Sequence, residues 1–176
     1  MVNAIYAAIW LGALWKWGDW RNWQKYYPTI LFFIIGDLLY LYLLSDHFPM
    51  WRYNPPTIDE KVGLTNTHIS LSIIIIKYPA TALIYLANFP QGSLLKQAFY
   101  FIGWVVIYFV NEFIDVKLHF IKYFNGWNLA WSVLFCTIMF FIIKVHFHKP
   151  MFAWLLSAGF IFFLWNVFDI PPAVFR

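Results

Sequence analysis

The sequence predicts an all-α fold, an integral membrane bundle of about six transmembrane helices, and three observations support this. Hydrophobic residues make up 62% of the 176 positions and charged residues only 11%, which is too little charge for a soluble domain of this size. The apolar residues fall into runs that approach the length of a bilayer span. The 11 Trp and 11 Tyr lie mostly near the ends of those runs, where aromatic rings favour the lipid headgroups.

Six apolar runs follow one another along the chain, joined by polar connections. Several are shorter than the roughly 20 residues that a bilayer core requires, so flanking Trp, Tyr and Lys side chains are expected to complete them. The first run lacks a basic leader and a cleavage pattern, and is interpreted as a helix rather than a signal peptide. No repeat or long linker divides the chain, so residues 1–176 are predicted to form a single transmembrane helical domain. The predicted spans cover residues 3–17, 29–44, 68–87, 97–116, 129–145 and 151–168.

The connections give a weak indication of orientation. The longest, residues 45–67, contains three prolines and an acidic pair and is the only sizeable extramembrane element expected. Lys and Arg number six on one side of the predicted bundle and five on the other, and the acidic second connection lies on the side with five. This distribution favours placing both termini outside. In either orientation, the second and fourth connections share one membrane face with the carboxyl terminus.

Three ionisable residues lie inside the apolar runs: Asp37, Lys77 and Glu112. A charge at membrane depth costs roughly 2.5 to 3.5 kcal/mol on insertion scales, so it usually persists where it is paired or useful. Asp37 and Lys77 lie near the centres of consecutive antiparallel spans, and a buried ion pair between them is predicted. Pro79 is predicted to kink the helix one turn from the lysine, as in transporters that place broken helices at binding sites. Two interpretations stay open: a ligand site, or a structural clasp that fixes helix register.

A second polar group lies toward the end of the fourth span. Asn111 and Glu112 are followed by Asp115, which shares a helical face with Glu112. Two carboxylates this close in apolar surroundings are expected to raise the pKa of at least one of them toward neutrality, which suits proton coupling. His68, at the start of the third span on the same membrane side, is a predicted partner. We interpret Asp115 as the start of the polar connection and Glu112 as part of the site.

Two features of the amino-terminal region indicate contacts with the membrane or with other helices. Ala4, Ala8 and Gly12 place a small residue at every fourth position, a close-packing face for another helix of this chain, a second copy or a partner subunit. A cluster of tryptophans alternates with basic residues and is interpreted as a set of interfacial anchors, with aromatic ligand recognition as the alternative. These tryptophans are Trp15, Trp17, Trp20 and Trp23.

Several function classes are not predicted. The basic residues are scattered singly, which excludes the stripe that nucleic-acid binding needs. Cys136 is the only cysteine, and His146 and His148 lack the spacing of helical metal ligands, so neither a metal nor another cofactor is expected. Hydrolase, kinase, phosphate-loop and zinc-protease motifs are missing from the sequence, and we do not predict an enzyme.

Four strings of the sequence carry a resemblance to known proteins. They are GDWRNWQKYYPTILFFIIGDLLYLYLL, THISLSIIIIKYPATALIYL, FNGWNLAWSVLFCTIMF and HKPMFAWLLS. Together they resemble a family of small multi-pass membrane proteins from spore-forming Firmicutes, over nearly the whole chain and including Asp37, Lys77, Pro79 and Trp127. The resemblance implies a helical fold and a bacterial plasma-membrane location. It implies no substrate, cofactor or catalytic residue.

The leading functional hypothesis is a membrane protein that binds or transports a small molecule or ion at a site built from Asp37, Lys77 and Glu112. The alternative is a structural or accessory subunit, in which these charges form a fold clasp and the Ala4, Ala8 and Gly12 face docks a partner. A membrane enzyme that acts on lipid is the third and least favoured hypothesis.

Overall fold

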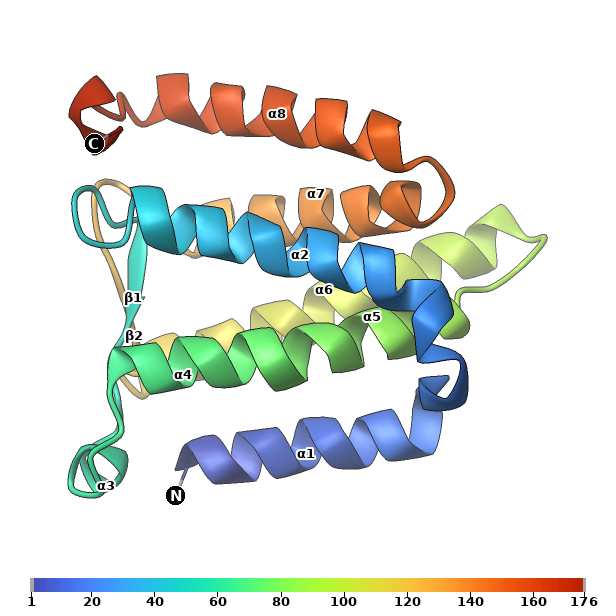
Figure 1. Cartoon of the computed structure of the whole chain (residues 1–176), viewed down its shortest axis with the longest axis horizontal. Coiled ribbons are helices and arrows are strands. Elements are labelled where there is room, and N and C mark those ends of the chain that lie inside the picture. Colours follow the sequence, from blue (N-terminus) through green and yellow to red (C-terminus); the bar gives the residue numbers. More distant parts are fainter. Residues whose placement is uncertain (1, 176) are drawn as a thin grey trace.

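Residues 2–175, which this computed structural model describes, fold into six helical passes that run alternately up and down, as predicted for an all-α bundle (Figure 1). A short β-ribbon covers one end. The elements are α1 (Val2–Trp17), the 3₁₀ turn η1 (Trp20–Asn22), α2 (Trp23–Leu43), β1 (Trp51–Tyr53), α3 (Thr57–Glu60), α4 (Asn66–Ser72), the π-helical turn η2 (Ile73–Lys77), α5 (Tyr78–Ala87), α6 (Leu94–Lys117), β2 (Ile121–Tyr123), α7 (Leu129–His148), α8 (Pro150–Val167) and the 3₁₀ turn η3 (Pro172–Val174). Helix α4, η2 and α5 form one continuous pass.

Five helices in the described chain, rather than the predicted six, are long and apolar enough to cross a membrane. The first pass falls short because α1 has only 16 residues, or about 24 Å at 1.5 Å per residue, against a hydrocarbon core of about 30 Å. Helix α1 still packs along α5 and η2 inside the same bundle. The five spanning helices make the chain a multi-pass membrane protein. They are Trp20–Leu43, Asn66–Ala87, Leu94–Lys117, Leu129–His148 and Pro150–Val167.

The β-ribbon lies at the end of the bundle that also holds α3 and the beginning of α1 (Figure 1). Strands β1 and β2 pair antiparallel, with Trp51 opposite Tyr123 and Tyr53 opposite Ile121. Side chains alternate across the ribbon, so these four point inward, while the paired residues Arg52 and Lys122 are exposed. The hydroxyl of Tyr40 on α2 anchors the ribbon, because it donates to the Trp51 carbonyl at 2.7 Å. The two longest polar connections thus close one end of the bundle together.

Helix α5 is the central element of the bundle, and every residue from Ala80 to Leu86 is buried. Its Tyr85 packs edge-on against Phe140 of α7, with ring centroids 5.0 Å apart, and donates a hydrogen bond to the Phe140 carbonyl at 3.2 Å. Both side chains are fully buried. In a bilayer, helices associate through such packing and hydrogen bonds, because burial from water is already complete. The central place of α5 puts η2, directly before it, inside the bundle.

The π-helical turn η2 lies directly before Pro79, where the sequence predicts a helix kink, and makes room for the proline ring. A proline has no N–H and its ring collides with the carbonyl four residues earlier, here that of Ile75. In η2 the helix widens, and the amide of Tyr78 donates to the carbonyl of Ile73, five residues back. The widened turn moves the Ile75 carbonyl out of the way of the ring. Lys77 is the last residue of this turn, so the proline determines where the lysine points.

The small-residue face of α1 points away from the bundle. Ala4, Ala8 and Gly12 are exposed, and a methyl group added at Gly12 would meet no described atom within 4 Å. The possibility that another helix of this chain packs there is therefore wrong. Helix α1 turns its polar and aromatic residues inward instead, because Asn3 and Tyr6 find hydrogen-bond partners inside the bundle.

The four predicted anchor tryptophans lie together at the end of the bundle opposite the β-ribbon, around the α1–α2 connection. They are Trp15, Trp17, Trp20 and Trp23, and all four are exposed. The Lys16 ammonium lies 4.8 Å from the ring centre of Trp17, which pairs a cation with an aromatic face. This arrangement supports an interfacial role, which stays a prediction.

Candidate functional site

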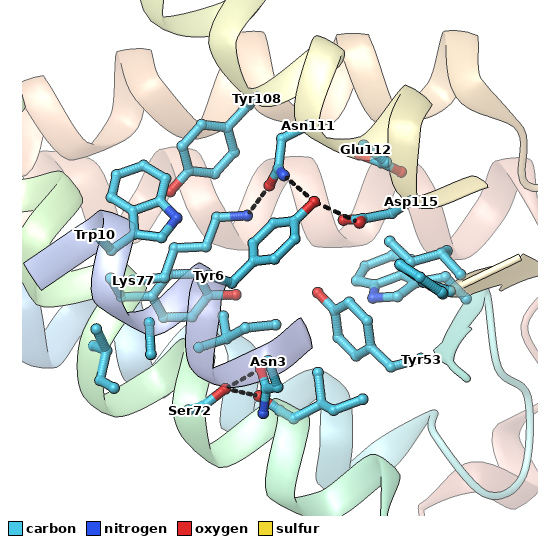
Figure 2. A pocket seen from close by; sticks show the side chains of 18 of the residues that line it. Asn3, Tyr6, Trp10, Tyr53, Ser72, Lys77, Tyr108, Asn111, Glu112 and Asp115 are labelled. Atoms are coloured by element: carbon cyan, nitrogen blue, oxygen red, sulfur yellow. Dashed lines mark hydrogen bonds between the residues drawn. The ribbon is translucent and has the colours of Figure 1, made fainter. Parts of the chain in front are cut away.

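A cavity of about 160 Å³ lies between α1, η2, α6 and α7 and is covered at one end by the β-ribbon. Its walls carry an unusual number of polar groups for the interior of a membrane bundle (Figure 2). Lys77 enters from η2, Tyr6 from α1 and Tyr53 from β1. Asn111, Glu112 and Asp115 enter from α6, and we call this space the polar cavity.

A chain of hydrogen bonds crosses the polar cavity from Lys77 to Asp115 (Figure 2). The Lys77 ammonium donates to Oδ1 of Asn111 at 2.8 Å. The amide nitrogen of Asn111 donates to the Tyr6 hydroxyl at 3.1 Å. The Tyr6 hydroxyl in turn donates to Oδ1 of Asp115 at 2.9 Å. The chain couples a cation on one helical pass to a carboxylate on another through a residue of α1.

The Lys77 ammonium also rests against two aromatic rings. Its nitrogen lies 4.6 Å from the ring centre of Tyr108 and 5.8 Å from that of Trp10. Both distances are within the range of cation–π attraction, which favours the charged form in a poorly solvated place. The lysine is thus held in one position, with further N–H donors that have no acceptor among residues 2–175.

Glu112 is held from the opposite wall of the polar cavity. Its Oε1 accepts hydrogen bonds from the Tyr123 hydroxyl at 2.6 Å and from the Ser132 hydroxyl at 2.5 Å. The Ser132 oxygen accepts a further bond from the indole N–H of Trp127 at 2.8 Å. One carboxylate oxygen is therefore fully engaged, and Oε2 has no donor in the part of the chain that the structure describes.

Tyr53 brings a hydroxyl from the β-ribbon to the same space, and its side chain points toward the cavity in Figure 2. Burial first, and then the nearby carboxylates Asp37, Glu112 and Asp115, raise the pKa of Tyr53 well above its usual value near 10. The hydroxyl therefore stays protonated at neutral pH. It makes no hydrogen bond to any residue between 2 and 175 and is available as a donor.

The predicted ion pair between Asp37 and Lys77 does not form in the part of the chain that the structure describes. Asp37 accepts a hydrogen bond from the Tyr78 hydroxyl at 3.0 Å and lines a different cavity, while Lys77 contacts Asn111. Lys77 and Tyr78 are neighbours in sequence and project about 100° apart on the helix, so only one of them can face α2. Tyr78 takes that position and separates the two charges.

Two other predicted placements also change. His68 lies at the exposed start of α4, where its ring accepts a hydrogen bond from the Thr65 amide at 3.2 Å, and it does not line the polar cavity. Its role there is to cap the helix. Asp115, interpreted from sequence as the start of a polar connection, lies within α6 and lines the cavity. Lys77, Asn111 and Glu112 are brought together as the sequence indicates.

Tyr6 and Tyr53 are the site residues that the sequence reasoning missed. Asn3 and Tyr6 lie three apart in the first apolar run, and this polar pair on one helical face is a signal for an inward-facing stripe. Tyr53 lies in a polar connection and carries no local signal. Among the described residues, no group of three or more His, Cys, Asp or Glu is arranged to hold a metal ion.

No family model, curated protein or solved structure matches this chain. The resemblance to multi-pass proteins of spore-forming Firmicutes therefore stays a prediction. The function has to be argued from the cavity itself.

Proposed function

We propose that this multi-pass membrane protein binds a small polar molecule or ion in the polar cavity. The observation that carries the proposal is that three residues lining one cavity have hydrogen-bonding atoms without a partner in the described part of the chain. Lys77 has further N–H donors, and Asp115 and Glu112 each have one carboxylate oxygen without a donor among residues 2–175. These residues line the cavity, so a water or a ligand inside it is expected to complete their hydrogen bonds.

The charges in the cavity define the chemistry of the ligand. Acceptor atoms of a ligand fit the Lys77 end, and a cationic or N–H-bearing group fits the carboxylates of Asp115 and Glu112. The aromatic rings of Trp10 and Tyr108 beside Lys77 provide an apolar wall. A cavity of about 160 Å³ is close to the roughly 150 Å³ of an engineered cavity that accepts benzene. We therefore expect a compact ligand with both donor and acceptor groups, such as a small zwitterion.

The cavity extends to the β-ribbon end of the bundle, because Val2, Pro56 and Asp59 are among its lining residues. A ligand would therefore enter from the side of the second connection. On the resemblance alone, we place the protein in a bacterial plasma membrane. Transport would need a second opening toward the α1–α2 end, so binding is the first step to test.

The test is a thermal-shift screen of the purified protein against amino acids, vitamins, small cations and lipids, since a ligand that binds the folded state raises its apparent stability. The stabiliser found is then measured with Lys77→Met and Glu112→Gln. The matched control is Lys144→Met, because Lys144 is another partly buried lysine on a spanning helix, held 4.0 Å from the ring centre of Phe89 outside the cavity.

The proposal expects the shift to disappear in Lys77→Met and Glu112→Gln while both variants remain folded, and to persist in Lys144→Met. A screen in which no compound in these classes stabilises the wild type would contradict it. A stabiliser that acts equally on all the variants would also contradict it, because it would bind elsewhere.

A structural role is the second candidate, and the hydrogen-bond chain favours it. Lys77, Asn111, Tyr6 and Asp115 tie η2, α6 and α1 together, as a clasp would. In that case each single substitution should reduce the folded yield, including Lys77→Met. The exposed face of Ala4, Ala8 and Gly12 would then dock a partner subunit or a second copy. A double substitution to apolar residues should restore the yield, since an unpaired buried charge costs more than a lost pair.

A further inference from the structure

A second cavity, of about 220 Å³, lies between α2 and α8 with α7 as its floor. Its lining is almost wholly apolar, and we call it the lateral groove. Ile35 and Leu39 on α2 and Ile161 on α8 line it and are 41–45% exposed, so its rim lies on the outer surface of the bundle. This surface belongs to two spanning helices and faces the bilayer. Molecules dissolved in the hydrocarbon core can therefore reach the groove.

Clusters that contain aromatic residues lie at both ends of the lateral groove. Toward the α7–α8 connection, Phe32 stacks on His146 with ring centroids 4.2 Å apart and meets the edge of Trp154 at 4.7 Å. Toward the β-ribbon, Met50 and Trp127 belong to a second buried cluster. The groove thus extends along α2 from Phe32 to the end of that helix at Leu43.

Among residues 2–175, Asp37 is the one carboxylate that lines the lateral groove, and one of its oxygens accepts no hydrogen bond. Its Oδ1 accepts from Tyr78, while Oδ2 has no hydrogen-bond donor. The other hydroxyls nearby are used elsewhere: Tyr40 donates to the Trp51 carbonyl, and Ser157 donates to the Ala153 carbonyl at 2.9 Å. A carboxylate oxygen in an apolar recess is costly unless a donor or a cation meets it.

We propose that the lateral groove binds an amine dissolved in the membrane, with its apolar body in the groove and its protonated nitrogen on Asp37. An anionic amphiphile would be repelled by this carboxylate, and a plain hydrocarbon chain would leave it unpaired. Asp37 lies six residues before the end of α2, or about 9 Å by helical rise, which is deeper than the amine of a phospholipid headgroup. The nitrogen must therefore belong to the hydrophobic molecule itself. This site adjoins the polar cavity, with which it shares lining residues such as Trp51 and Tyr78, but the proposal does not depend on ligand binding there.

The experiment compares two probes of the same shape, 4-phenylbutylamine and the neutral 4-phenylbutan-1-ol, on the full chain in phosphatidylcholine nanodiscs at pH 7. Thermal unfolding followed by tryptophan fluorescence gives an apparent affinity for each probe. Gly36 lines the groove and has no described atom within 4 Å of an added Cβ, so Gly36→Leu adds a bulky side chain to the groove wall without a clash at its Cβ. Gly12→Leu is the matched control, since Gly12 has the same open surroundings on the far side of α1.

The proposal expects the wild type and Gly12→Leu to bind the amine at least about tenfold more tightly than the alcohol. This preference should vanish in Gly36→Leu and in Asp37→Asn, which keeps an acceptor for Tyr78, and should persist in Lys77→Met. Equal affinities for amine and alcohol in the wild type would overturn the proposal. An amine preference that survives in Gly36→Leu would do the same.

Discussion

Replacing Asn111 with leucine should destabilise the folded protein more than removing the lysine that it contacts. Asn111 is the one described hydrogen-bond acceptor of the Lys77 ammonium, at 2.8 Å. A hydrogen bond to a charged group contributes about 1.5–3 kcal/mol, and the bond from Asn111 to Tyr6 adds about 1 kcal/mol. Asn111→Leu should therefore cost about 2.5–4 kcal/mol. Lys77→Met removes the charge together with its need for a partner and should cost only about 1 kcal/mol, for the orphaned Asn111 oxygen.

The assay is reversible unfolding in mixed micelles with increasing SDS, followed by tryptophan fluorescence, on the wild type, both single variants and the double variant. The double variant should be about as stable as Lys77→Met, which gives a coupling energy of about 2.5–4 kcal/mol between the two positions. Single effects that add to within about 0.5 kcal/mol would show that Lys77 and Asn111 do not interact in the folded state, and would refute the reasoning. A larger loss from Lys77→Met than from Asn111→Leu would refute it as well.

Three further substitutions test other parts of the account. Asp59→Ala removes the carboxylate that accepts hydrogen bonds from the first two described amides of α1, at 3.1 and 3.0 Å, and should lower the stability by about 1–2 kcal/mol. We expect faster hydrogen exchange at the start of α1, and unchanged exchange would count against the contact. Pro79→Ala restores an amide donor, so η2 should tighten to an ordinary α-helical turn and move Lys77 away from Asn111. The stabilisation by a ligand should then fall without loss of folded protein. An unaltered ligand response would contradict this. Phe140→Ala leaves a cavity at a fully buried site and should lower the free energy of unfolding in SDS by about 3–5 kcal/mol. A decrease of under 1 kcal/mol would contradict the central packing of α5 on α7.

The bundle could be predicted from the sequence because hydrophobic composition and run length are local properties. The same pattern gave the depth of each charge, since depth follows from the position of a residue along its span. It could not give the direction in which a side chain points around the helix. Lys77 and Asp37 illustrate this, because the π turn before Pro79 and the adjacent Tyr78 decide that α6, and not α2, receives the lysine.

The remaining site residues depend on contacts that no local pattern records. Tyr53 reaches the polar cavity because two polar connections pair as β1 and β2, far apart in the sequence. The small residues of α1 left it open whether their face packs on this chain or on a partner, and the hydrogen bonds of Asn3 and Tyr6 determine which face points inward. Where small-residue packing and hydrogen bonding compete on one helix, the unsatisfied polar group in hydrocarbon is the more costly outcome.

The central claim is that the polar cavity binds a ligand through Lys77. The most direct measurement is a calorimetric titration of the best stabiliser from the screen into the wild type, Lys77→Met and Lys144→Met. The account predicts a dissociation constant at least about tenfold higher for Lys77→Met, equivalent to a loss of about 1.4 kcal/mol, and a change of less than about twofold for Lys144→Met. Equal dissociation constants for all three proteins would contradict the account.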